Sequence, residues 1–218
     1  MNENLLRSLL IVGLIVAVIG VIAALLTSGK SKGGGEGQSR RTRAFTLFEP
    51  AYKRAGRAGE KAAVRAVSRV LRDEDRLFSN VEFEYDGRPC EIDLVIVNHC
   101  GVFIIEVKNY SGVLRGDEDD DNWIKKKTTR DGLTHTKTVI NPVKQVKRQT
   151  YLLAHYLRYH GCDAWVDGYV WLIRGNSPVD GPFLLNSTDD VDRVIHASSK
   201  RPLSPDAIRR IAELLEDN

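Results

Sequence analysis

Two apolar runs joined by a short turn constrain the fold of this chain more than any other feature. The runs EIDLVIV (residues 91–97) and GVFIIEVKN (residues 101–109) are rich in Val, Ile and Phe, which favour β-strands. The tetrad NHCG, residues 98–101, joins them, and Asn and Gly adopt the backbone angles of a tight hairpin turn. Because both strands are apolar on both faces, we expect them at the centre of a sheet that is covered on each side.

Charged residues interrupt this hairpin at Asp93, Glu106 and Lys108. If the turn is centred between His99 and Cys100, Asp93 lies directly across from Glu106, with their Cβ atoms about 4.5–5.5 Å apart. Glu106 and Lys108 are two residues apart and therefore share a face of their strand. This register predicts that the three side chains converge, whereas a slip of one residue would place the two acids on opposite faces.

Two carboxylates at that separation inside a sheet are destabilising unless a proton or a cation lies between them. Their oxygen atoms are ligands that suit Mg²⁺ or Mn²⁺, so the pattern predicts a metal site at Asp93 and Glu106. The alternative is a buried ion-pair cluster without chemistry. We favour the metal site because a buried charged triad stabilises a fold less well than apolar residues of similar volume.

The segment GRAGEKAAVRAVSRVLR, residues 56–72, predicts an amphipathic helix whose apolar stripe contains Val64, Val67 and Leu71. Glu60 lies one turn before Val64 on the same face, so its carboxylate is expected to point inward. Taken alone, Glu60 is better explained by the favourable interaction of an acid with the first turn of a helix. Both interpretations stay open at this point.

Near the N-terminus, residues 8–29 contain no charged residue, and LLIVGLIVAVIGVIAALL is long enough to cross about 30 Å of hydrocarbon as a helix. We expect residues 1–28 to be a transmembrane anchor rather than a cleaved signal peptide, whose apolar region would run only about 7–15 residues. Small-residue spacings in this segment would permit two helices to pair and leave a homo-oligomer open, namely Gly13 with Ala17 and Gly20 with Ala24.

The charges around this segment predict its orientation. Arg7 precedes it beside Glu3, whereas several basic residues follow it: Lys30, Lys32, Arg40, Arg41 and Arg43. We therefore expect a single-pass membrane protein, in a bacterial inner membrane, whose C-terminal domain is cytoplasmic. The sparse cysteines agree with a reducing compartment. Residues 29–44 read as a flexible basic linker that lies against anionic lipid, and residues 45–218 as one globular domain.

Basic residues predominate between residues 122 and 160, where Asp131 is the one acid and Lys125, Lys126 and Lys127 are consecutive. Such a segment could neutralise phosphates and make nucleic-acid binding depend on salt. The preceding run DEDDD, residues 117–121, lacks the glycine and terminal glutamate of a calcium loop, so we interpret it as a solvated acidic loop.

A second helix is predicted to begin at Pro142, with Asn141 as its N-cap. Its early turns carry polar residues at the helix end that phosphate favours: Lys144, Gln145, Lys147 and Arg148. A buried strand at residues 166–175 and an amphipathic helix that opens at Ser204 and Pro205 complete the expected domain. We expect Trp165 and Trp171, beside and within that strand, to belong to the core.

The ordered series of Glu60 in a helix, Asp93 in EIDLVIV and Glu106-Val107-Lys108 in IIEVKNY resembles the PD-(D/E)xK nuclease superfamily. The segments AGRAGEKAA, IDLVIVNHCGVFIIEVKNYSGVLRGD, DNW and NPVKQVKRQ narrow the resemblance to its nuclease-related domain family, from about residue 56 to about residue 160. Ile92 stands where the superfamily name has proline. That position varies across the superfamily, so the departure puts little in doubt.

The resemblance implies a restriction-endonuclease-like α/β fold, a mixed central sheet flanked by helices, here preceded by the single transmembrane helix. It implies a metal ion held by Asp93, Glu106 and the carbonyl of Val107, with Glu60 as an outer or second-metal ligand. Lys108 would orient or activate the attacking water and stabilise charge on the phosphate. The resemblance also singles out Gln145 as a residue near the metal or the scissile phosphate.

We therefore expect a membrane-anchored, metal-dependent nuclease that hydrolyses phosphodiester bonds. Membrane lipid and nucleic acid are the expected partners, with DNA favoured over RNA. The expected nucleic-acid contacts are Lys125, Lys126, Lys127, Lys144, Lys147 and Arg148. The alternative is a non-catalytic, membrane-tethered nucleic-acid or protein-interaction module that retains the fold, since intact site residues do not guarantee turnover.

Overall fold

Five strands form the central sheet in the computed structural model of the protein, which describes residues 51–216 except 176, 198 and 200. In spatial order they are β1 (Arg76–Tyr85), β2 (Arg88–Asn98), β3 (Gly101–Lys108), β7 (Val166–Leu172) and β8 (Leu184–Leu185). The pairs β1–β2 and β2–β3 are antiparallel, whereas β7 runs parallel to β3 and β8 runs parallel to β7. The predicted mixed sheet is confirmed.

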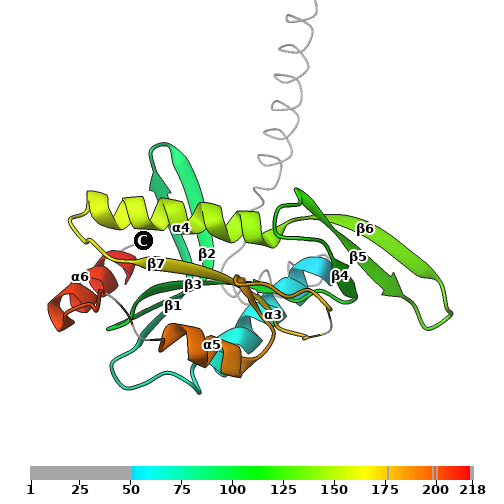
Figure 1. Cartoon of the computed structure of the whole chain (residues 1–218), viewed down its shortest axis with the longest axis horizontal. Coiled ribbons are helices and arrows are strands. Elements are labelled where there is room, and N and C mark those ends of the chain that lie inside the picture. Colours follow the sequence, from blue (N-terminus) through cyan, green and yellow to red (C-terminus); the bar gives the residue numbers. More distant parts are fainter. Residues whose placement is uncertain (1–50, 176, 198, 200, 217–218) are drawn as a thin grey trace, which may run out of the picture. The chain divides into compact units, whose positions relative to one another are not determined.

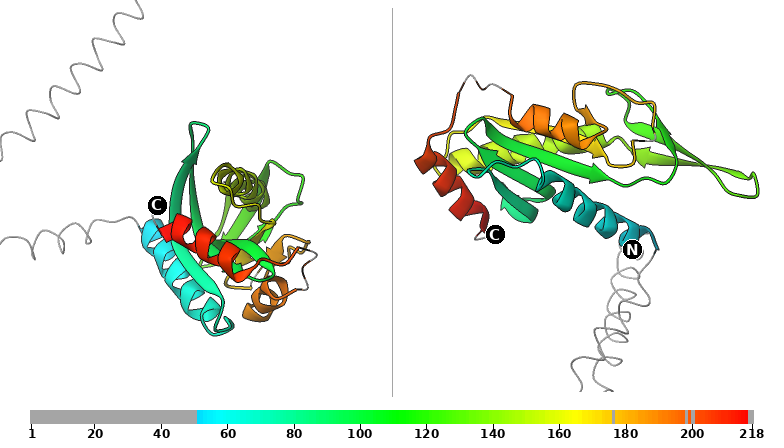
Figure 2. Two further views of the ribbon diagram at one scale, coloured as in Figure 1. Left: turned by 90° about the vertical axis from the view of Figure 1, so that its left-hand side faces the viewer. Right: turned by 90° about the horizontal axis from the view of Figure 1, so that it is seen from below.

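Helices cover both faces of this sheet (Figures 1 and 2). One face packs against α4 (Pro142–Tyr159), and the other packs against α3 (Ala51–Val67) and α5 (Thr188–Ile195). The fourth helix, α6 (Pro205–Glu216), contacts β1 and β2. Buried apolar side chains therefore form two cores, which we name the α4-side core and the α3-side core. The flanking helices agree with the predicted α/β class.

A second, three-stranded antiparallel sheet is inserted between β3 and α4. It consists of β4 (Val113–Arg115), β5 (Asn122–Thr128) and β6 (Thr134–Ile140), and its β5–β6 hairpin projects away from the central sheet (Figure 1). Trp123 anchors its base, since the indole is 1% exposed and its Nε1 donates to the carbonyl of Asp117 at 2.8 Å. Gly116 is required beside it, because a Cβ there would fall 2.2 Å from the indole and φ is +154°.

The β2–β3 hairpin has the register that the sequence predicted. Leu94 pairs with Ile105 and Asn98 pairs with Gly101, so His99 and Cys100 form the turn. The Asn98 side chain stabilises this turn, because its Oδ1 accepts a hydrogen bond from the Cys100 amide at 2.8 Å. This hairpin sets the position of every polar residue at the far end of the two strands.

Alternation of side chains breaks in β2 at Asp93. Val95 faces the α4-side core, as does Ile92, although strict alternation over three residues would put them on opposite faces. The neighbouring strand β1 breaks at the matching position, where Asn80 has a φ of +54°. Pairing between β1 and β2 keeps one register on both sides of this point. The break leaves Asp93 free to turn toward β3 rather than toward either core.

Helix α3 begins and ends earlier than the predicted range of residues 56–72, because it spans Ala51–Val67. Its end is marked by short-range backbone bonds, from the Arg69 amide to the Ala66 carbonyl and from the Val70 amide to the Val67 carbonyl. Leu71 packs on the α3-side core from beyond the helix end. The helical spacing of Leu71 therefore predicted a helix that is longer at this end than the one in the structure.

The predicted transmembrane helix requires a correction. Within the described part of the chain, no helix is long and apolar enough to cross a membrane. The 18-residue helix α4 carries Lys144, Lys147, Arg148 and Arg158, which the hydrocarbon of a bilayer would exclude. A fold preceded by a transmembrane helix, and a single-pass membrane protein with a cytoplasmic C-terminal domain, are therefore not supported. Residues 1–28 and 29–44, to which the anchor and linker were assigned, lie outside the described residues.

Candidate active site

Asp93 lies in the gap that opens where β2 and β3 part. Backbone pairing of the two strands ends at Leu94 and Ile105, one position short of Asp93 and Glu106. The Asp93 Oδ2 instead accepts a hydrogen bond from the backbone N–H of Val107 at 2.7 Å. A side-chain carboxylate thus takes the place of a main-chain acceptor, and it is fixed between the two strands.

The carbonyl of Val107 is directed to the same gap. The N–H and C=O of one strand residue point to the same side, and successive residues alternate. The Lys108 carbonyl accepts a hydrogen bond from the Ile173 amide at 3.3 Å, on the β7 side. Alternation therefore puts the Val107 carbonyl on the β2 side, where Asp93 lies. Oxygen atoms of Asp93 and Val107 consequently border one gap.

Glu106 is held at both carboxylate oxygens, although its side chain is almost completely buried. Its Oε1 accepts from the Lys108 Nζ at 2.5 Å, and its Oε2 accepts from the Gln149 Nε2 at 2.7 Å. The same Gln149 amide group donates to the carbonyl of Glu91 at 2.9 Å. These contacts fix the orientation of the buried Glu106 carboxylate.

We call the group formed by Asp93, Glu106 and Lys108 the Asp93 cluster. Helix α4 supplies two glutamines to this cluster from adjacent turns. Gln145 Oε1 accepts a hydrogen bond from Lys108 Nζ at 3.1 Å, and Gln149 binds Glu106. The helix begins where the sequence predicted, with the Asn141 Oδ1 accepting from the Val143 amide at 2.9 Å. Burial of Val146 against the sheet turns both glutamines toward the end of β3. The sheet and α4 together enclose the cluster.

The electrostatics of the cluster centre on Asp93. Burial raises its pKa from 3.8 to about 7, with the Glu106 charge as the next cause. The hydrogen bond from Val107 and the charge of Lys108 act in the opposite direction. Asp93 therefore binds a proton far more readily than an exposed aspartate, and a nearby cation could compensate its charge in place of that proton.

Lys108 remains an ammonium group in this setting. Burial alone would lower its pKa, but the charge of Glu106 and its hydrogen bond together outweigh burial and raise the pKa. The neighbouring Tyr110 has a raised pKa, chiefly because of burial, and stays a neutral phenol. The cluster thus contains a fixed cation beside the Glu106 carboxylate.

Glu60 reaches the cluster from α3. A close approach between α3 and the end of β3 positions it, because a Cβ on Gly59 would fall 2.6 Å from the Cβ of Asn109. Asn109 also donates from Nδ2 to the carbonyl of Ala55 at 2.8 Å. The charge of Glu60 contributes, as the smallest of the named causes, to the raised pKa of Asp93. Glu60 is therefore near Asp93, and it acts on Asp93 through space.

The predicted basic residues of β5 lie beside a hollow next to the cluster. Lys125 places its ammonium 5.4 Å from the centre of the Tyr110 ring. Lys126 and Lys127 line the hollow together with two cations that the sequence did not single out, Arg115 and Arg174. No acidic side chain is among the residues that line this hollow in the described part of the chain: Ser111, Gly112, Val113, Arg115, Lys126, Lys127, Thr128 and Arg174. We name it the basic hollow.

The early turns of α4 contact the acidic loop. Lys144 forms an ion pair with Asp121, and Lys147 forms one with Glu118. Both pairs lie at the surface, where solvent and salt screen them, so a phosphate can replace either acid. Arg148 is exposed and donates from Nη2 to the carbonyl of Pro89 at 3.3 Å. The three predicted cations therefore stay near the site, two of them with acidic partners.

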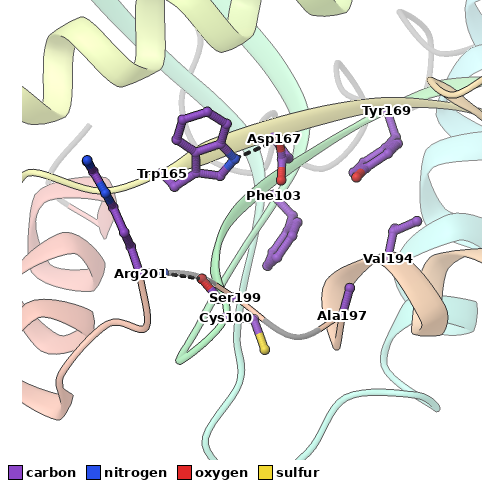
Figure 3. Close-up of a pocket in the computed structure, with 9 residues that line it drawn as sticks. All are labelled: Cys100, Phe103, Trp165, Asp167, Tyr169, Val194, Ala197, Ser199 and Arg201. Carbon is purple, nitrogen blue, oxygen red and sulfur yellow. Dashed lines mark hydrogen bonds between the residues drawn. The ribbon is translucent and has the colours of Figure 1, made fainter.

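A different pocket lies at the other end of the sheet (Figure 3). Phe103 lies five residues before Lys108 on β3, which is about 16 Å at the usual rise of a strand. Trp165 is 60% exposed at its mouth and donates from Nε1 to Asp167 at 2.9 Å, so its expected place in the core is wrong, whereas Trp171 is buried. The lining is Cys100, Phe103, Trp165, Asp167, Tyr169, Val194, Ala197, Ser199 and Arg201. None of these residues belongs to the Asp93 cluster.

The donor atoms of the cluster fit a hard divalent cation in part. Asp93, Glu106 and the Val107 carbonyl offer oxygen atoms, which Mg²⁺ and Mn²⁺ prefer. Within the residues that the structure describes, however, no three His, Cys, Asp or Glu side chains are grouped so that they could hold a metal ion. A cation here would depend on backbone, water and substrate oxygens for the rest of its coordination, as Mg²⁺ commonly does.

Comparison with known proteins identifies the family of this chain. The chain matches the model of the nuclease-related domain (NERD) over residues 55–173, more than half of its length. The chain belongs to the nuclease-related domain family. It is also similar to an uncharacterized protein of Bacillus anthracis, with 36% identity over 70 residues, which are 31% of this chain and 32% of that protein. The chain thus matches about a third of that relative's length. No solved structure matches the chain.

The nuclease-related domain of this chain contains site residues that sequence reasoning missed. Gln149 fixes Glu106, and it lies one helical turn after Gln145 in the segment NPVKQVKRQ, so its spacing was a usable signal. Arg174 is a different case. Its Nε donates to the Oδ1 of Asn109 at 2.6 Å. The two residues are 65 positions apart, so no local sequence pattern could have predicted this contact.

Proposed function

We propose that this nuclease-related domain is a metal-dependent hydrolase of nucleic-acid phosphodiester bonds. The observation that carries the proposal is the juxtaposition of Asp93, Glu106 and Lys108 at the parting of β2 and β3. A buried carboxylate whose pKa is raised to about 7 beside a second carboxylate has a strong physical reason to bind a divalent cation. Membership of the nuclease-related domain family supports the same class of reaction.

In this proposal Asp93 and Glu106 would hold Mg²⁺ or Mn²⁺ together with the carbonyl of Val107, and Glu60 would contribute from the outer shell. When bound, the cation would neutralise charge on the phosphate and lower the pKa of a coordinated water. The Val107 N–H keeps Asp93 oriented toward the gap. Gln149 does the same for Glu106, so both carboxylates are preorganised before substrate arrives.

Lys108 supplies a fixed positive charge in this mechanism. Its raised pKa favours an ammonium that donates hydrogen bonds over a neutral amine that accepts a proton. We therefore assign it the stabilisation of charge on the phosphate and the orientation of the attacking water. Gln145 keeps the ammonium in place by accepting one of its hydrogen bonds, over 3.1 Å.

The basic hollow and the predicted cations of α4 would bind the substrate backbone. Arg115, Lys126, Lys127 and Arg174 line one side without an acidic neighbour among the lining residues, so a polyanion gains there from counterion release. Lys144, Lys147 and Arg148 offer further positive charge at the start of α4. Binding by these groups would not depend on base sequence, because they contact phosphates.

The experiment is a cleavage panel with the full chain. Single- and double-stranded DNA and RNA are incubated with Mg²⁺, with Mn²⁺, or with EDTA. We expect cleavage of at least one substrate with a divalent cation and none with EDTA. Asp93→Asn should reduce the rate by at least about a hundredfold, whereas Asp206→Asn, at an exposed acid of α6, should leave it unchanged.

Two results would decide against the proposal. Cleavage that persists in EDTA would remove the metal from the mechanism. Salt-sensitive binding without cleavage of any substrate would favour a non-catalytic nucleic-acid-binding module with the same fold.

A further inference from the structure

An aromatic stripe runs along the solvent-facing side of α4. Arg148, Tyr151, His155 and Tyr159 follow one another at spacings of three, four and four residues, which puts them on one face of the helix. Tyr85, at the end of β1, adds a fifth side chain beside them. We name these residues the α4 stripe.

The rings of the α4 stripe contact one another and leave large faces open. Tyr151 and His155 have ring centres 4.3 Å apart, and Tyr85 stacks on His155 at 5.9 Å. Tyr159 meets Tyr85 edge to face at 6.3 Å. Tyr151 is nevertheless 53% exposed and Tyr159 is 77% exposed. Packing of the domain does not explain why such large rings face solvent.

The α4 stripe is continuous with the candidate active site. Gln145 and Gln149 face the cluster from the first turns of α4, and Arg148 lies on the neighbouring face of the same turns. The three aromatic residues then follow toward the end of the helix. From Arg148 to Tyr159 the helix rises about 16 Å, which is long enough for several rings to meet one strand.

We propose that the α4 stripe binds unpaired bases of a single-stranded nucleic acid that leads away from the Asp93–Glu106–Lys108 cluster. Aromatic rings are stacking platforms for bases, and they tolerate any sequence because every base has a π-face. Bases within a duplex are stacked on one another and present no free face. The inference rests on the proposed function for its choice of nucleic acid, and it adds that the substrate has a single-stranded segment.

Charges around the stripe fit this occupant. Arg148 lies at the end of the α4 stripe that is nearest the cluster. Arg158 precedes Tyr159 in the sequence, its side chain is 65% exposed, and its Nε lies 3.8 Å from the Oδ1 of Asp163. On the β1–β2 side, Glu84 and Asp86 border the hollow beside Tyr85 and Tyr159. Arg148 at one end of the stripe and Arg158 near the other would contact phosphates of the strand whose bases meet the rings.

The test is binding by the full chain in EDTA, where cleavage of a metal-dependent enzyme is silent. Fluorescence anisotropy compares a labelled single strand with a blunt duplex of the same length. We expect the combined variant Tyr151→Ala and Tyr159→Ala to weaken single-strand binding by at least about tenfold and duplex binding by less than about twofold. Trp165→Ala removes a comparably exposed aromatic residue that lines the pocket of Figure 3 instead of the α4 stripe, and it should change neither.

Replacement by phenylalanine at Tyr151 and Tyr159 should keep binding, because the rings remain. Equal losses for single strand and duplex, or no loss at all, would overturn the inference. So would a sedimentation measurement in which the wild type is a dimer and the alanine variant a monomer, since the stripe would then be an interface between copies. If the protein binds single strands as expected but cleaves no substrate, the proposed nuclease function is contradicted and the inference about the α4 stripe is not.

Discussion

Gln149 donates a hydrogen bond from Nε2 to the Oε2 of Glu106 at 2.7 Å, across 43 residues of sequence. The same amide group reaches the carbonyl of Glu91, while the Oε1 of Gln149 is buried and has no partner among the described residues. The contact fixes the carboxylate that also binds Lys108. Helix α4 is therefore a positioning element for the cluster as well as a cover for the sheet.

Replacement of Gln149 by methionine tests this role while keeping the side-chain volume. We expect the metal concentration for half-maximal cleavage to rise about 10- to 100-fold, because Glu106 loses the group that orients it. The free energy of unfolding should fall by only about 1–3 kcal/mol, measured by denaturant unfolding. An unchanged metal requirement in a folded variant would show that Gln149 is merely structural.

Two glycines of α3 provide a matched pair for the placement of Glu60. Gly59→Ala should cost about 1–3 kcal/mol of folding free energy and slow cleavage, because its Cβ would lie 2.6 Å from the Cβ of Asn109. Gly56→Ala should stabilise the domain by about 0.5–1 kcal/mol, since its nearest neighbour would be the Glu60 Oε1 at 3.7 Å. Thermal unfolding of both variants checks this, and equal effects would refute the close approach of α3 to β3.

Asn141 joins the start of α4 to the acidic loop, and its two functions can be separated. Its Oδ1 caps the helix, while its Nδ2 donates to the carbonyls of Glu118 and Asp120 at 2.8 and 2.7 Å. Asn141→Asp keeps the cap and loses the donor, so we expect a loss of about 1–3 kcal/mol in the free energy of unfolding. Asn141→Ala should lose about 1 kcal/mol more. Denaturant unfolding of both variants measures this, and an aspartate variant as stable as wild type would refute the role of the amide.

Protonation of Asp93 should couple metal binding to pH. Its folded-state pKa of about 7 lies above the usual aspartate pKa of 3.8, so its contribution to stability is complete below about pH 4 and is lost as pH rises through 7. A cation must displace this proton. We expect Mg²⁺ to raise the melting temperature more at pH 8 than at pH 5.5, and Asp93→Asn to abolish the difference. Equal shifts in wild type at both pH values would contradict this coupling.

The sequence predicted the backbone of the hairpin better than the direction of its side chains. The turn residues Asn98 and Gly101 set the register, so the proximity of Asp93 to Glu106 could be inferred. That inference assumed strict alternation, which fails at Asp93 because the carboxylate turns into the gap and binds the Val107 amide. A side chain that replaces a main-chain acceptor leaves no periodic signal.

Contacts between distant segments account for the rest. Trp165 precedes a buried strand and was expected in the core, yet it is largely exposed because it lines the open pocket that Figure 3 shows. Lys144 was expected to be available for phosphate, whereas the structure pairs it with Asp121 from the acidic loop. Local sequence patterns predict neither the exposure of Trp165 nor the pairing of Lys144, since both depend on contacts between separate elements of the fold.

The most direct test of the central claim is the single-turnover rate of phosphodiester cleavage with saturating Mg²⁺ for wild type and Lys108→Ala. Lys61→Ala, an exposed lysine on α3, serves as the matched control. The proposed mechanism predicts a rate at least about a hundredfold lower for Lys108→Ala, unchanged for Lys61→Ala, with nucleic-acid binding in EDTA preserved in both. A Lys108→Ala protein that cleaves as fast as wild type would contradict the assignment of this cluster as the active site.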